Sequence, residues 1–258
     1  MSQAAANPSL APSQPPSGSP PQPPSGSPPR VPTLDDLYEW TSEPDHRVVI
    51  QGVDWAFYEQ LVDSIPEGAN IHVDYDGKDV EIMSLSTLHD GDKKLFGQLV
   101  EAIAQELEIP YKGAGSTTWK RPEVARGLES DECYFFGADK LAAVAEARAR
   151  RSKRIADYPN PDLGIEVDIS PSKIDRPGIY AALKVSEVWR FDGEREEVII
   201  ERLGEDGSYH PVEGSAFLAI RAKEVRRWVV EEDSSDDSAW ARRLRAWARA
   251  ELAPRLPR

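Results

Sequence analysis

The segment 161–172, PDLGIEVDISPS, constrains the fold of this chain more than any other stretch. Apolar Leu163, Ile165 and Val167 alternate with polar or small positions, and this period of two predicts a strand with one apolar face. Since alternate side chains share a face, Glu166 and Asp168 lie on the same side, roughly 7 Å apart at about 3.3 Å per residue. Two interpretations stay open: a divalent-metal site of carboxylate oxygens, or the solvent-facing side of an ordinary strand.

The rest of the chain mixes helical and strand patterns. Pro171 ends the strand, and Ser172-Lys-Ile-Asp175 predicts a capping box that opens a helix. Apolar spacing predicts further helices over 33–40, 55–65, 139–151, 222–230 and 239–252, and a long one from Ser86 or Thr87 to just before Pro110. Strands are predicted over 70–75, 80–84, 112–119, 130–136, 188–191, 198–203 and 209–212. This order predicts an α/β domain with a mixed sheet.

Composition divides the 258 residues into three parts. Residues 1–31 are rich in Pro, Ser and Gly and contain QPPSGSP twice, so we expect a disordered tail, either a spacer or a ligand for a protein partner. Residues 32–231 are long enough to bury a sizeable core. Residues 232–258 read as an acidic linker and an arginine-rich amphipathic helix.

Charge is distributed unevenly along the chain. The net charge is −14, yet both ends are positive, so residues 32–238 carry −20. Such an acidic body argues against avid, sequence-independent binding of nucleic acid, but not against a local basic cleft. We expect the arginine-rich end to fold back on this body, with a nucleic-acid arm as the alternative. The basic run 148–154 is explained by a favourable helix end, with phosphate steering as the alternative.

Cysteine usage and hydropathy indicate the compartment. The chain has one cysteine, Cys133, which fits a reducing cytoplasm. No signal peptide is visible, and no apolar run approaches the roughly 18 residues needed to span a bilayer. We therefore expect a cytoplasmic protein that does not enter a membrane.

Three runs of sequence carry a resemblance to a known family. They are YDGKDVEIMSLSTLHD at 75–90, SDECYFFG at 130–137 and PDLGIEVDISPSKIDRPGIYAALKVSEVWRFDG at 161–193. Together they resemble the Uma family, a group of restriction-endonuclease-like proteins in the PD-(D/E)xK nuclease-like superfamily. The resemblance covers about Trp55 to Trp228. It implies a mixed central sheet flanked by helices, and a Mg²⁺- or Mn²⁺-dependent endonuclease that hydrolyses phosphodiester bonds, most plainly those of DNA.

The resemblance also assigns roles to residues. Asp131 and Glu166 match the family's two acids and would bind the metal, with the backbone carbonyl of Val167 and the carboxylate of Asp168 as further candidates. Asp168 stands where many superfamily members have lysine. The family's cation comes from the following helix, four residues before the tyrosine, which here is Arg176. Lys173, three residues earlier on the same predicted helical face, is the substitute candidate.

Several assignments stay open at this stage. His89 matches the family's histidine and either approaches the site or serves the helix terminus. We interpret Glu81 as a solvated strand position, with a site-facing position as the alternative. Lys184 stands where the family has glycine and disturbs the usual helix stop. Asp168 and Arg176 support a rival function, a catalytically inactive binding or regulatory module. A homodimer is the assembly expected of a nuclease that cuts two strands.

Overall fold

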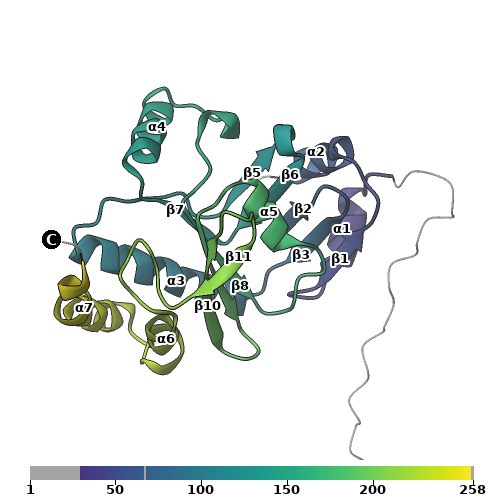
Figure 1. Ribbon diagram of the computed structural model, residues 1–258. Coiled ribbons are helices and arrows are strands. Elements are labelled where there is room, and N and C mark those ends of the chain that lie inside the picture. The colour runs from purple at the N-terminus through teal and green to yellow at the C-terminus, as the bar shows by residue number, and fades with distance from the viewer. Residues whose placement is uncertain (1–29, 67, 257–258) are drawn as a thin grey trace, which may run out of the picture.

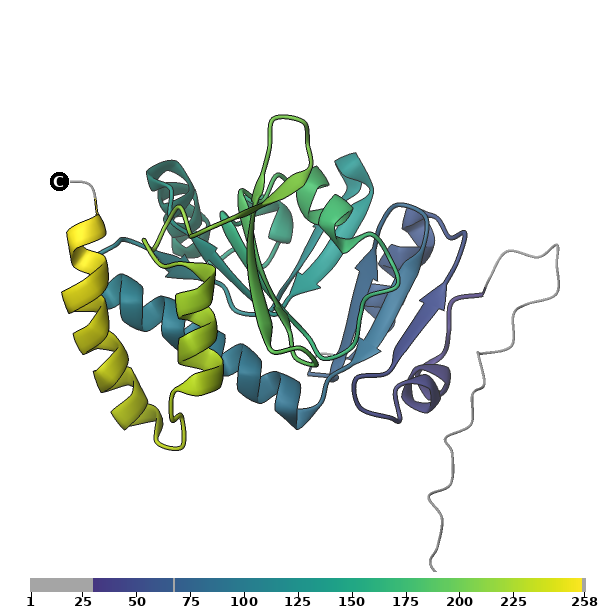
Figure 2. The ribbon, with the colours of Figure 1, turned by 60° about the horizontal axis from the view of Figure 1, so that its bottom comes forward.

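The computed structural model describes residues 30–66 and 68–256 (Figure 1). Its strands form two sheets, and helices cover both (Figures 1 and 2). The strands are β1 (Arg47–Ile50), β2 (Ile71–Tyr75), β3 (Val80–Ser84), β4 (Lys112–Gly113), β5 (Thr117–Arg121), β6 (Arg126–Ser130), β7 (Glu132–Phe135), β8 (Leu163–Asp168), β9 (Glu187–Asp192), β10 (Glu197–Leu203) and β11 (Tyr209–Val212). The α-helices are α1 (Leu34–Trp40), α2 (Trp55–Ser64), α3 (Thr87–Glu106), α4 (Ala138–Ala149), α5 (Arg176–Ala182), α6 (Ala222–Arg226) and α7 (Asp237–Trp247).

The first sheet is antiparallel, in the order β1-β3-β2-β6-β5. One face packs on α1 and α2 through a core that includes Leu37, Tyr58, Leu61, Val73 and Ile82. Because side chains alternate along a strand, the other face of β2 and β3 carries the polar residues between these apolar ones. This polar face is turned toward the second sheet, as the contacts of the site show below.

The second sheet is mixed, in the order β11-β10-β9-β8-β7-β4. Only β8 and β9 run parallel, and α5 lies between them in sequence, as a parallel connection requires. The apolar face of β8 packs on α3, with α6 and α7 on the same side (Figure 2). The opposite face meets α4 and α5 through residues such as Val144, Ile179 and Leu183.

Between β6 and β7 the chain passes from the first sheet to the second at one residue, Asp131. Ser130 pairs with Thr117 in the first sheet, and Glu132 pairs with Ile165 in the second. The ladder between β7 and β8 ends there, so the next free N–H on that edge of β8, that of Val167, needs another acceptor. The carboxylate of Asp131 provides it, with Oδ2 at 2.8 Å from the Val167 nitrogen.

Most of the predicted elements are confirmed, including the mixed α/β class. The predicted strand 112–119 is wrong in detail, because it is two strands, β4 and β5, that belong to different sheets. The capping box at Ser172 is also wrong: α5 begins at Arg176, and its N-cap is Asp175, which accepts the Gly178 N–H at 3.0 Å. Strands β1 and β6 were not predicted.

The structure tests the expectation for the C-terminal end of the chain but not the one for the N-terminal tail. The predicted disordered tail lies outside the described residues, except for positions 30 and 31. The expectation that the arginine-rich end folds back is confirmed, since Arg249 binds Glu106 at 2.7 Å and Arg255 binds Glu224 at 2.8 Å. Among the described residues, no helix is long and apolar enough to cross a bilayer.

Candidate active site

Glu166 and Asp168 project from the polar face of β8, as the alternation predicts. The solvent-facing interpretation is wrong for Glu166, because this residue is 2% exposed. Its carboxylate accepts a hydrogen bond from the Tyr180 hydroxyl and pairs with the Arg176 guanidinium. Asp168, at the end of the strand, keeps 24% of its side chain exposed and also contacts Arg176, with Oδ1 and Nη1 3.4 Å apart. The two carboxylates therefore form one cluster around a buried cation.

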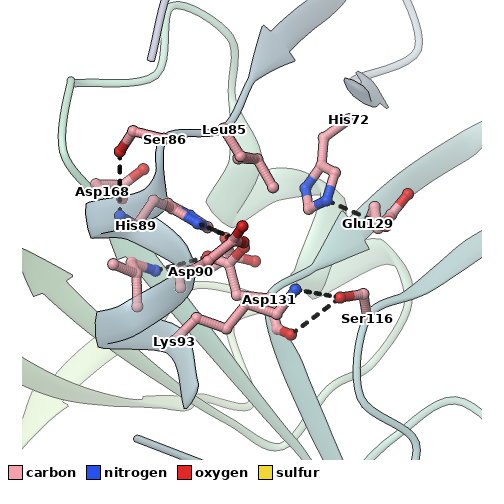
Figure 3. A network of polar contacts seen from close by, with 12 residues as sticks. His72, Leu85, Ser86, His89, Asp90, Lys93, Ser116, Glu129, Asp131 and Asp168 are labelled. Atoms are coloured by element: carbon pink, nitrogen blue, oxygen red, sulfur yellow. Dashed lines mark hydrogen bonds and ion pairs between the residues drawn. The ribbon is translucent and has the colours of Figure 1, made fainter. Parts of the chain in front are cut away.

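Asp131 joins this cluster from the junction between the sheets. It is 1% exposed, and its Oδ1 lies 3.2 Å from Nε2 of His89 in the first turns of α3 (Figure 3). The side chain of His89 thus contacts the candidate site, while its backbone N–H donates to the N-cap residue Ser86 at 3.1 Å. Through Oδ2, Asp131 also fixes the backbone of Val167, next to Glu166.

Arg176 is the cation at the centre of the cluster. It is the first residue of α5, 6% exposed, and lies four positions before Tyr180. Besides Glu166 and Asp168, it contacts Asp74 of β2, with Nε and Oδ2 3.0 Å apart. Asp74 also accepts the Glu129 N–H at 2.9 Å. Asp74 was not predicted from the sequence, although His72 and Asp74 alternate with buried apolar residues in β2 and so mark a polar face.

Glu81 and Lys173 occupy places that the sequence did not predict. Glu81 is 1% exposed, so the solvated interpretation is wrong; it accepts the Lys173 N–H at 2.6 Å and the Ser172 hydroxyl at 2.8 Å. The edge strand β1 and the 170–173 segment cover it. Lys173 is not on the helix, and its ammonium donates to the Arg47 carbonyl at 3.0 Å. Its side chain is therefore engaged away from Glu166.

Burial and pairing shift the pKa values of the site in opposite directions. Burial raises the pKa of Glu166 well above its ordinary value despite Arg176, and the neighbouring carboxylates add to the rise. Burial acts in the same direction on Asp131, but the bond to His89 outweighs it and the pKa of Asp131 is lowered. Burial alone would lower the pKa of His89, yet Asp131 holds it above its ordinary value. An added positive charge beside Glu166 would therefore favour its ionised form.

The residues of the site suit a hard divalent cation by chemistry and charge. Five carboxylates gather here: Asp74, Glu81, Glu166 and Asp168 pair with the guanidinium groups of Arg47 or Arg176, and Asp131 pairs with His89. Asp131 Oδ1 and Glu166 Oε2 are buried, and their contacts are the ion pairs with His89 and Arg176. Carboxylate oxygens are the ligands that Mg²⁺ prefers. In this conformation Arg176 lies among them, and within the described residues no three His, Cys, Asp or Glu side chains stand ready to share a metal.

The family model Uma2, described as "Putative restriction endonuclease", matches residues 55–225, which is more than half of the chain. The chain belongs to the Uma2 family. The match includes Asp131, Glu166 and Arg176 and leaves β1 and α7 outside. By the description of its family, this Uma2 chain is of nuclease type.

The Uma2 assignment rests on the family model, because the similar solved structure is only distantly related. One similar solved structure is "a putative nuclease belonging to DUF820" from Anabaena variabilis, with 14% sequence identity and a TM-score of 0.45. The match covers 69% of this chain and 99% of the other. No curated protein matches the chain.

Two carboxylates of this Uma2 cluster, Glu166 and Asp168, line a cleft of about 460 Å³ over the polar face of β8, β9 and β10, and Asp131 lies outside its lining. Arg190 of β9 lies in register with Glu166 and pairs with Glu201 at 2.7 Å. The cleft is lined by more carboxylates than cations; its charged residues are Glu166, Asp168, Arg176, Arg190, Asp192, Glu194, Arg195, Glu197 and Glu201. The cleft therefore carries an excess of negative charge, which added cations would offset.

A second polar network borders Asp131 on the α3 side (Figure 3). His72 of β2 lies 3.1 Å from Glu129 of β6. Lys93, one turn after His89, donates to the Ser116 hydroxyl, which in turn lies 3.5 Å from the Asp131 carbonyl. His72 was not among the site residues predicted from the sequence. The pairing of β2 with β6 is what brings it near the site.

Proposed function

We propose that this chain is a metal-dependent endonuclease that hydrolyses phosphodiester bonds in DNA. The observation that carries the proposal is the convergence of Asp131, Glu166 and Arg176 from three elements at the junction of the two sheets. All three lie inside the segment that matches the Uma2 family.

The roles follow from the chemistry of each group. Asp131 and Glu166 would hold Mg²⁺ or Mn²⁺, with the Val167 carbonyl and the Asp168 carboxylate as further ligands. A bound divalent ion supplies Lewis-acid stabilisation of the phosphoryl oxygens and a more acidic water. Arg176 stabilises negative charge that develops on the phosphate, but it cannot act as a base because guanidinium stays protonated. With three carboxylate partners, Arg176 can exchange one of them for a phosphate oxygen.

A second candidate function is supported by one specific observation. Arg176 already neutralises part of the cluster, and no ready group of three metal-binding side chains exists in the part of the chain that the structure describes. A chain that kept the nuclease fold and replaced the metal by an internal guanidinium would be a catalytically inactive binding or regulatory module. The two candidates differ in their response to metal.

The deciding experiment is cleavage of labelled single- and double-stranded DNA with Mg²⁺, Mn²⁺ or EDTA. We expect cutting that EDTA abolishes and that Glu166→Gln lowers at least about 100-fold, the scale on which one group of a preorganised charged site acts. Glu201→Gln, in the same cleft but paired with Arg190, is the matched control and should retain cutting. Absence of cutting, together with no Mn²⁺-dependent rise in the melting temperature, would support the inactive module instead.

Further expectations concern assembly and location. We propose DNA as the partner and a homodimer as the assembly, because one site cuts one strand at a time; sedimentation with and without DNA tests this. A protein partner for the proline-rich tail would be lost when residues 1–31 are deleted. The single cysteine supports a cytoplasmic location.

A further inference from the structure

Arg47 is a buried cation that lies before the segment matched by the family model. It belongs to β1, which pairs with the edge of β3, and it is 4% exposed. Its guanidinium makes three contacts: Nη1 lies 2.6 Å from Glu81 Oε2, Nη2 lies 3.0 Å from Asp168 Oδ1, and Nε donates to the Ser170 hydroxyl at 3.0 Å. A buried guanidinium is stable only when its donors are paired in this way.

Two guanidinium groups converge on Asp168. Its Oδ1 contacts Arg47 at 3.0 Å and Arg176 at 3.4 Å, and it is the most exposed of the three carboxylates that Arg176 contacts. Asp168 therefore links Arg176, which lies inside the family-matched segment, to Arg47 of β1, which lies before it. Removal of Arg47 would leave Glu81 without its guanidinium partner and Asp168 with only one, and an unpaired buried carboxylate is destabilising.

The segment 170–173, between β8 and α5, is fastened to β1 and β3. The Ser170 hydroxyl donates to the Asp45 carbonyl at 3.0 Å, and Lys173 Nζ donates to the Arg47 carbonyl at 3.0 Å. Glu81, held by Arg47, accepts from the Ser172 hydroxyl and the Lys173 N–H. This segment joins Asp168 at one end to Arg176 at the other, so its position sets the distance between them.

We propose that Arg47 is a positioning residue of the active site. It holds Asp168 directly and, through Ser170 and Glu81, holds the segment that brings Arg176 to Glu166. The chain before residue 55 is therefore part of the functional site. This inference rests on the proposed nuclease function for its catalytic consequence, but its structural consequence can be measured without any cleavage.

The test compares Arg47→Gln and Arg47→Lys with Arg121→Gln. Arg121 is a matched control: it is 7% exposed and donates to the carbonyls of Ile155 and Tyr158, with no carboxylate contact among the described residues. Each variant is measured for the single-turnover cleavage rate with Mn²⁺, for DNA affinity, and for hydrogen exchange over residues 168–176.

We expect Arg47→Gln to lower the single-turnover rate about tenfold or more with little change in DNA affinity, because misplaced reacting groups slow the chemical step. Arg47→Lys should restore only part of the rate, since the compact ammonium group lacks the planar, forked donors with which the guanidinium contacts Glu81, Asp168 and Ser170. Exchange over 168–176 should become faster in Arg47→Gln and stay unchanged in Arg121→Gln.

Wild-type cleavage and wild-type exchange in a folded Arg47→Gln protein would overturn the inference. Equal effects of Arg47→Gln and Arg121→Gln would also overturn it, because they would show a general loss of stability. If the wild-type protein cuts no DNA, the proposed function fails, and the exchange measurement alone decides the role of Arg47.

Discussion

At the scale of single residues, Lys184 holds an unusual backbone conformation. It follows the last turn of α5 with a φ of 56°, in the left-handed region. The Lys184 N–H donates to the Ala181 carbonyl at 3.0 Å, and the Val185 N–H donates to the Tyr180 carbonyl at 3.1 Å. This pair of bonds is a Schellman motif, whose left-handed position glycine occupies at least cost. The side chain itself is exposed, so only the backbone makes the position special.

We predict that Lys184→Gly raises the free energy of unfolding by about 0.5–1 kcal/mol, because glycine avoids the left-handed strain and loses part of that gain to its own flexibility. Lys184→Ala should leave stability nearly unchanged, since alanine meets the same strain. Urea unfolding at pH 7 measures both variants. A gain for alanine as large as that for glycine would show that charge, not backbone conformation, is responsible.

The residues of the site were predictable to different degrees. Glu166, Asp168 and the glycine-like position of Lys184 follow from local patterns and the family resemblance. Asp74 and Arg47 lie about 100 residues or more before Arg176 and Asp168 in the sequence, and only the packing of two sheets brings them together. No local spacing contains that information. The burial of Glu81 has the same origin, because the strand that covers it, β1, shows no strong pattern of its own.

At the scale of elements, Asp162 fastens the start of α4 to the start of β8. The N-cap of α4 is Gly137, which has no side chain to cap the helix. Asp162 serves instead: its Oδ2 accepts the N–H groups of Phe136 and Gly137 at 2.8 and 3.0 Å, and Oδ1 pairs with Lys140 at 2.7 Å. Burial would raise the pKa of Asp162, but Lys140 and the two N–H groups hold it below its ordinary value.

We predict that Asp162→Asn lowers the free energy of unfolding by about 2 kcal/mol at pH 7, because hydrogen bonds to a charged acceptor are lost. A carboxyl group with a lowered folded-state pKa stabilises the fold above its ordinary pKa of 3.8, and this contribution disappears as pH falls through the folded-state value. The difference between the variant and the wild type should therefore be constant above about pH 5 and shrink toward pH 3.

Urea unfolding at several pH values measures this difference. Lys140→Met, which removes the ion pair and keeps both backbone bonds, is the control and should cost less than Asp162→Asn. A difference that stays equal from pH 7 to the acid limit would contradict the role of the charge.

Helices and strands were predicted well where a periodic pattern runs over many residues. They were predicted poorly where contacts with distant strands determine their bounds. The 20 residues of α3 and the alternation of β8 are clear in the sequence. The stretch 126–135 is divided between two sheets at Asp131, and nothing local marks that division. The start of α5 was misplaced because Ser172 offered a plausible cap, whereas its hydroxyl is bound by Glu81 from a distant strand.

At the scale of the whole molecule, the chain beyond the family match completes the main core. Trp240, Leu244, Ala248 and Leu252 are fully buried and belong to the same core as α3 and β8. Arginines on the other faces contact the body: Arg249 and Arg255 pair with Glu106 and Glu224, and Arg245 donates to the neutral Gln105 at 2.9 Å. The buried apolar face holds this arginine-rich helix on the body, and the exposed ion pairs add little to it.

We predict that Trp240→Ala destabilises the whole protein by about 3–5 kcal/mol, the usual cost of removing a fully buried tryptophan. Trp240 is 0% exposed, packs edge-on against Trp228 with ring centroids 5.9 Å apart, and donates its indole N–H to the Trp228 carbonyl at 3.0 Å. Because α7 shares its core with α3 and β8, unfolding should remain one cooperative transition at a lower urea concentration.

Arg242→Ala, an exposed position on the same helix, is the control and should change stability by less than about 0.5 kcal/mol. Two separate transitions in the wild type, with only the weaker one shifted by Trp240→Ala, would mean that α7 is an appendage whose loss leaves the carboxylate cluster intact.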